Sequence, residues 1–95
     1  STNLWPGLTV VGLTNEIKKE LDVPGDINGA VIAAVFPNTS SDKVGLRSGD
    51  IITAVDKRNI DSVLDFYREL NSTNSKEVMF RIYREGNEML LGLVK

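Results

Sequence analysis

The sequence predicts an α+β domain, a small barrel or sandwich of about five mostly antiparallel strands with two or three helices. Three observations lead to this class. Short segments rich in β-branched residues recur along the chain, Pro and Gly separate them, and residues 62–70 carry the period of an amphipathic helix. The 95 residues suit one hydrophobic core, so we expect a single domain over 1–95, with 1–3 as a linker or a cloning remnant.

The N-terminal segment predicts a strand and then a short helix. Leu8 to Gly12 alternates between two faces and follows the bend Trp5-Pro6-Gly7. A capping residue at Thr14 or its neighbour starts a helix with apolar positions every four residues. One of these positions is Ile17, which we expect to lie in the core.

The middle of the chain predicts two buried strands and a helical turn. Ala30 to Phe36 is almost wholly apolar, as expected of a central strand covered on both faces. Residues 41–44 then form one helical turn, with Gly45 as its left-handed stop. Ile51 to Val55 is the next buried strand, and 56–59 is a polar turn.

The last third of the chain predicts the main helix and a hairpin. Ser62 and Asp65 match a capping box, and apolar residues follow at helical spacing. A polar loop over 71–76 leads to two alternating strands, 78–84 and 88–94, which are joined by a short turn.

Composition excludes many functions. The chain has neither histidine nor cysteine, so it cannot carry a Ser-His-Asp triad, a Cys-His pair or a disulfide framework, and we expect no enzymatic activity. Neither a cofactor nor a metal ion is expected. A net charge of -2 argues against nucleic acid as a partner, and no apolar run is long enough for membrane insertion.

The stretch from Pro37 to Ile52 is the most specific feature of the sequence. It combines a proline, small residues, a Gly45-Leu46 pair and a Gly49-Asp50 pair before an isoleucine-rich strand. Together with Trp5-Pro6-Gly7-Leu8 and the helix, it resembles the PDZ domains of HtrA/DegP-type, trypsin-like bacterial serine proteases. The resemblance implies a PDZ-like fold of the circularly permuted bacterial type, which binds peptides.

A binding mode follows from the physics of an edge strand. An extended peptide can add itself to the strand at residues 8–12, opposite the apolar face of the helix at 62–70. Successive amides around Gly7 would form a nest for a C-terminal carboxylate, as the resemblance implies. The predicted peptide-binding residues are Pro6, Gly7, Leu8, Thr9, Val10, Val63, Phe66, Tyr67 and Leu70.

Two residues of the N-terminal bend, Trp5 and Pro6, affect the expected end of the groove. The family has an N–H donor just before the loop glycine, whereas Pro6 has none. A lost hydrogen bond to a charged acceptor costs on the order of 1.5 to 3 kcal/mol, so carboxylate capture is expected to be weaker. Trp5 either caps the end of the groove or anchors the domain to upstream sequence, and we favour the anchor.

Two functions remain open. The domain captures C-termini or exposed hydrophobic segments of unfolded proteins and presents them to a protease domain outside this chain. Alternatively, it is a structural or regulatory module with little peptide affinity, which sets oligomer geometry or restrains the protease. The resemblance implies a parent protease in the periplasm or cell envelope, in protein quality control, and leaves a homo-oligomeric parent open. Another PDZ-bearing protease, of the site-2 or the C-terminal processing type, is a third reading.

Overall fold

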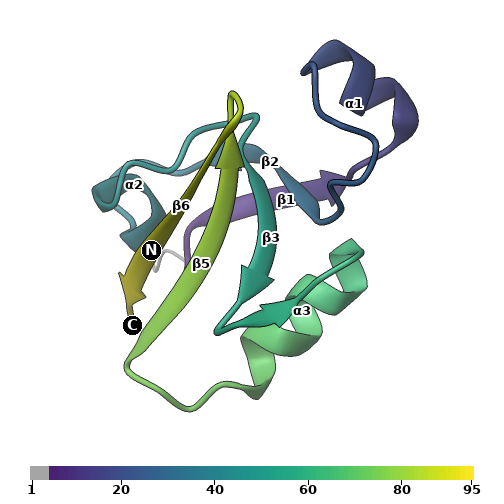
Figure 1. Ribbon diagram of the computed structural model, residues 1–95. Helices are drawn as coiled ribbons and strands as arrows, with labels where there is room; N and C mark the ends of the chain where they lie inside the picture. Colours follow the sequence, from purple (N-terminus) through teal and green to yellow (C-terminus); the bar gives the residue numbers. More distant parts are fainter. Residues whose placement is uncertain (1–4) are drawn as a thin grey trace.

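The computed structural model describes residues 5–95 and confirms the predicted α+β class (Figure 1). One antiparallel sheet of six strands forms the body, in the order β1-β2-β3-β5-β6, with the short β4 paired to β3. No helix in the described part of the chain is long and apolar enough to cross a membrane. The predicted linker at 1–3 lies outside the described residues. The elements are β1 Leu8–Gly12, α1 Asn15–Glu20, β2 Ala30–Val35, α2 Ser40–Lys43, β3 Ile51–Val55, β4 Arg58–Asn59, α3 Val63–Ser72, β5 Glu77–Arg84 and β6 Asn87–Val94.

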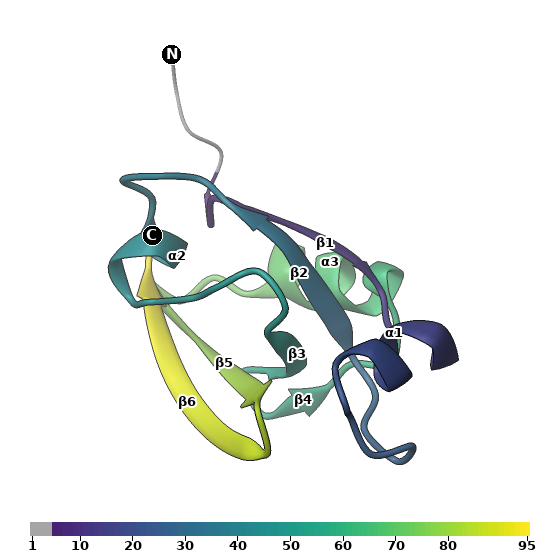
Figure 2. The same cartoon turned by 90° about the horizontal axis from the view of Figure 1, so that it is seen from above.

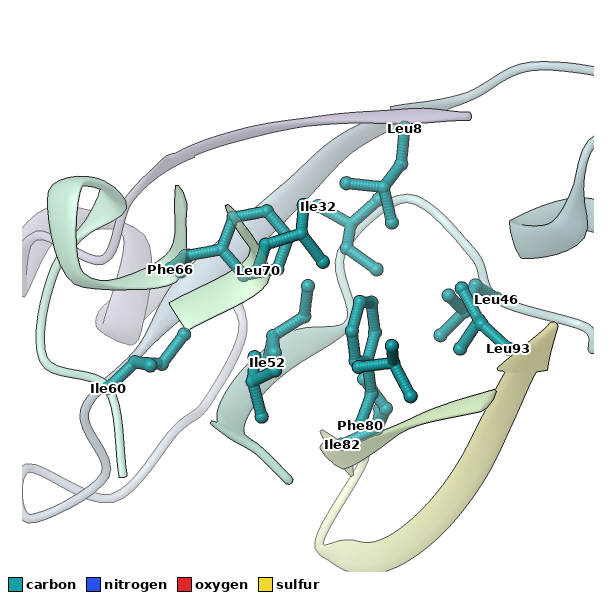
Figure 3. Packing of buried hydrophobic residues seen from close by; sticks show 13 residues of the cluster. Leu8, Ile32, Leu46, Ile52, Ile60, Phe66, Leu70, Phe80, Ile82 and Leu93 are labelled. Carbon is teal, nitrogen blue, oxygen red and sulfur yellow. The ribbon is translucent and has the colours of Figure 1, made fainter. Parts of the chain in front are cut away.

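The core lies between the sheet and α3 (Figure 3). Phe66 on α3 and Phe80 on β5 have no exposed surface and meet edge to face, with their ring centroids 5.7 Å apart. Leu8 brings β1 into the same cluster. Rings of this size each bury about 150–250 Å², so they fix the distance between helix and sheet.

The helix α3 begins at the predicted cap Ser62, but the return bond of the capping box goes to the N–H of Asp61 rather than to that of Ser62. The Ser62 hydroxyl accepts a hydrogen bond from the Asp65 N–H at 3.1 Å, and the Asp65 carboxylate accepts from the Asp61 N–H at 3.1 Å. The helix ends at Ser72, two residues beyond the predicted 62–70, so the polar loop after it is shorter than expected.

The polar turn predicted over residues 56–59 is shorter in the structure, so the predicted length is wrong. Asp56 and Lys57 alone form the turn, with φ of 49° and 69°, and Arg58 and Asn59 form β4. Such a two-residue turn needs left-handed backbone at both positions. The Asp56 carboxylate holds it in place, because it accepts from the Met79 N–H at 2.8 Å and from a side-chain hydroxyl on the α3–β5 loop.

Two burial predictions are also wrong. Ile17 is only half-buried and contributes nothing to the core cluster, because α1 stands beyond the ends of β1 and β2, apart from the body (Figures 1 and 2). The strand β2 is covered on both faces only in its first half. Its Ala33 is exposed, and Phe36, just beyond its end, is 46% exposed.

The Gly49-Asp50 pair forms the predicted turn and also an ion pair that the sequence did not predict. Asp50 is buried, and its carboxylate accepts from Arg84 Nε at 2.7 Å and Nη2 at 2.5 Å. The Arg47 N–H donates to the same carboxylate at 2.9 Å. This pair ties the β2–β3 connection to the end of β5.

Candidate functional site: the free edge of β1 beside α3

Among the strands of residues 5–95, β1 is an edge of the sheet and has β2 as its single neighbour. The Phe36 N–H donates to the Gly7 carbonyl at 2.8 Å, which makes Leu8 and Val35 a non-hydrogen-bonded pair of the antiparallel ladder. The N–H and C=O of Leu8 therefore point away from β2. The irregularity in this ladder skips Ala33 on β2, so β1 keeps its alternation and Val10 also turns its N–H and C=O outward.

The bend before β1 is fixed from the side of α2. The Pro6 carbonyl accepts from the Ser41 N–H at 3.0 Å and from its hydroxyl at 2.7 Å. In a trans peptide the N–H points opposite the preceding carbonyl, so the Gly7 N–H points away from α2. Within residues 5–95 that N–H makes no hydrogen bond. The amides of Gly7 and Leu8 are therefore two successive free donors, as the predicted nest requires.

The helix α3 has two flanks, and the polar contacts distinguish them. On one flank the Oε1 atom of Glu69 lies 3.6 Å from the Nε atom of Arg58 on β4. At 100° per residue, Leu64 and Tyr67 lie on the opposite flank. Their side chains are 65% and 40% exposed. The helix α3 also packs beside β1 (Figure 2). Because β4 is paired to β3 rather than to β1, the flank opposite Glu69 lies on the side of the free edge of β1.

The predicted site residues separate into core and surface. Leu8, Phe66 and Leu70 are buried members of the core, so they support the site from beneath. Val10 and Val63 are half-buried at its rim, and Tyr67 and Thr9 are exposed. Pro6 and Gly7 are buried. Of these two residues only Gly7 has an N–H that it can donate to a ligand, because proline has none. The structure thus brings the strand and the helix together.

A pocket of about 300 Å³ lies where the C-terminal end of α3 approaches the bend before β1. Its lining residues are Trp5, Leu70, Asn71, Thr73 and Lys95. Trp5 donates from Nε1 to the Val94 carbonyl at 3.1 Å, which holds its ring at this place. Asn71, Thr73 and Lys95 of this pocket, and Leu64 of the exposed flank, were not among the predicted site residues. Asn71 follows Tyr67 by one helical turn, so a longer helix would have indicated it.

Three further features of the described residues were compared with the β1 edge: a second hollow, possible metal ligands and shifted pKa values. A larger hollow of about 870 Å³ lies on the outer face of the sheet, lined by residues including Met79 and Leu90, away from β1 and α3. Among residues 5–95, no group of three or more Asp or Glu side chains is placed to hold a metal ion. In the described part of the chain, the one marked pKa change belongs to Arg84, remote from β1: its hydrogen bonds to Asp50 raise its pKa above the ordinary value.

A family model described as PDZ domain matches residues 7–93 of the chain. Among curated proteins, a probable periplasmic serine endoprotease DegP-like of Ectopseudomonas mendocina is 37% identical over 81 residues, which are 84% of this chain and 16% of that protein. A serine protease HtrA-like of Staphylococcus aureus is 32% identical over 82 residues, 83% of this chain and 11% of that protein. The chain thus spans less than a fifth of the length of these relatives.

Solved structures show the same fold. The HtrA3 PDZ domain bound to a phage-derived ligand, FGRWV, superposes with a TM-score of 0.79 at 20% identity, over 95% of this chain and 82% of that one. The HtrA-type protease AlgW with a decapeptide gives a TM-score of 0.78 at 25% identity, over 95% of this chain and 28% of that one.

Proposed function

The chain belongs to the PDZ domain family and resembles the PDZ domains of HtrA/DegP-type serine proteases, and we propose that it binds extended polypeptide segments. The peptide adds as a further antiparallel strand to the outer side of β1 and is covered by the Leu64 and Tyr67 flank of α3. Its ligands are C-termini or exposed hydrophobic segments of other proteins. Binding presents them to a protease domain outside this chain, or regulates that domain.

One observation carries this proposal: the row of outward N–H and C=O groups on β1, at Leu8 and Val10, runs beside the exposed flank of a helix. The unpaired backbone groups supply affinity that depends little on peptide sequence, and the flank supplies side-chain selection. The similar structures also support peptide binding, since the HtrA3 PDZ domain and AlgW are described with bound peptides. The relatives' names also support a periplasmic protease as the parent.

A structural or regulatory role with little peptide affinity is the second candidate, and Pro6 favours it. This residue has no N–H, so the nest before β1 offers only the amides of Gly7 and Leu8. A domain of this kind would use the free edge of β1 to pack against other parts of a homo-oligomeric parent.

N-methylated peptides test strand addition without changing the protein. In an antiparallel addition the last and third-last N–H groups of the peptide face β1, whereas the second-last faces away. We expect N-methylation of the last or the third-last N–H to weaken binding about tenfold, because one hydrogen bond is lost and the methyl group collides with the strand. Isothermal titration of the tightest binder among pentapeptides ending in Val, Leu or Phe measures this.

The second-last N-methyl peptide is the matched control and should bind like the parent peptide. Equal weakening at all three positions would argue against strand addition. Absence of binding of every pentapeptide at millimolar concentration would argue for the structural or regulatory role instead.

A further inference from the structure

Lys95 places a positive charge at the end of the proposed groove. Its ammonium lies 5.4 Å from the centroid of the Trp5 ring and donates to the Thr73 carbonyl at 2.9 Å. An ammonium has three N–H donors, so two remain for other acceptors. Lys95 and Trp5 line the same pocket of about 300 Å³, and no described residue of that lining is acidic.

The pocket adjoins the place where the last residue of a bound peptide would lie. Trp5 is two residues before Gly7, a span of at most about 7 Å of extended chain. The free amides of Gly7 and Leu8 would meet the peptide carboxylate, but Pro6 supplies no third donor. A carboxylate held by two amides has lone pairs that can accept further hydrogen bonds, and Lys95 is the one cationic residue among the described residues that line the pocket.

We propose that Lys95 makes this site select free C-termini over internal segments, because its ammonium binds the terminal carboxylate in place of the amide that Pro6 lacks. The inference rests on the proposed peptide binding at β1. The Trp5 ring holds the charge near the pocket through a cation–π contact, and the four-carbon side chain has the freedom to turn from the Thr73 carbonyl to a ligand.

A comparison of acid and amide peptides tests this inference. The same pentapeptide ending in Val is titrated as a free acid and as a C-terminal amide against the wild-type domain, Lys95→Met and Lys95→Arg. We expect Lys95→Met to weaken binding of the acid about fivefold, the upper range for a solvent-exposed charge pair, and to leave the amide unchanged. Lys95→Arg should retain the preference for the acid.

Lys19→Met is the matched control, because it removes one exposed positive charge from α1, at the other end of β1. It should change neither titration. Raising the salt concentration should weaken acid binding to the wild type more than to Lys95→Met.

The outcomes separate the two proposals. If both peptides bind the wild type and Lys95→Met changes neither affinity, or both equally, Lys95 is not the selector, while peptide binding stands. If neither peptide binds the wild type, the proposed function fails, and this inference fails with it. Circular dichroism of each variant verifies that the fold is retained.

Discussion

Replacing Asp50 by alanine is expected to lower the free energy of unfolding by about 3 kcal/mol. The side chain of Asp50 is 3% exposed and that of Arg84 is 18% exposed. Without the carboxylate, the guanidinium loses both of its hydrogen bonds to Asp50 and retains only the Gly45 carbonyl, at 2.8 Å. The N–H of Arg47 also loses its acceptor. Urea denaturation followed by circular dichroism measures the effect.

A double-mutant cycle shows whether the loss comes from the pair. Arg84→Met alone should cost as much as Asp50→Ala, because it leaves a buried carboxylate without its cation. The double variant should lose at least about 2 kcal/mol less than the sum of the two single variants. Simple additivity would mean that the two residues stabilise the fold independently, contrary to the geometry.

The contribution of the Asp50–Arg84 ion pair to the free energy of unfolding should not change with pH around neutrality. The hydrogen bonds that Arg84 donates to the Asp50 carboxylate raise the pKa of Arg84, which is already far above neutrality. A base with a raised pKa in the folded state stabilises the fold below its unfolded pKa and loses that contribution only as the pH rises through the folded value. For Arg84 that window is strongly alkaline. The effect of Arg84→Met should therefore be the same at pH 7 and pH 9.

Replacing Gly7 by alanine is expected to cost about 3 kcal/mol and to abolish the bend before β1. Gly7 has φ of 91°, a left-handed conformation that costs other residues about 1–2 kcal/mol. A Cβ at this position would also lie 2.1 Å from the Cβ of Thr39. Thr39 has little room to yield, since it is buried and caps α2. Overpacking of this kind adds a further 1–3 kcal/mol or so.

Substitutions at two other glycines distinguish the cost of the left-handed backbone from the cost of the contact with Thr39. Gly45 has φ of 86° but free space around its Cβ position, so Gly45→Ala should cost about 1 kcal/mol, from backbone conformation alone. Gly12 has neither feature, and Gly12→Ala should stay within about 0.5 kcal/mol of the wild type. Equal losses at Gly7 and Gly45, measured by urea denaturation, would show that the contact with Thr39 is unimportant.

The fold was largely predictable because local patterns and the tertiary structure agree. The bounds of β1 and β3 follow from alternation and burial, and the start of α3 follows from its capping box. Ile17 shows the limit of this reasoning. Its spacing indicates an apolar helix face, but no pattern within α1 reveals that the helix has no sheet beneath it.

The candidate site was predictable in its elements and less so in its side chains. A helical pattern identifies Phe66 and Tyr67 as apolar without saying which faces the core, and the structure assigns Phe66 to the core and exposes Tyr67. The pair of Asp50 with Arg84 and the position of Lys95 beside Trp5 each join residues far apart in the sequence. Such contacts depend on sheet order, which local patterns do not contain.

The central claim is that peptides add to β1 beside α3, and backbone amide NMR shifts test it most directly. The labelled domain is titrated with peptides ending in Val, Leu or Phe, each as free acid and as amide. Strand addition predicts that shifts cluster at Gly7 to Val11 and along α3, and capture of the terminal carboxylate adds several-fold tighter binding of the free acid. Shifts confined to the outer face around Met79 and Leu90, or none at millimolar peptide, would contradict the claim.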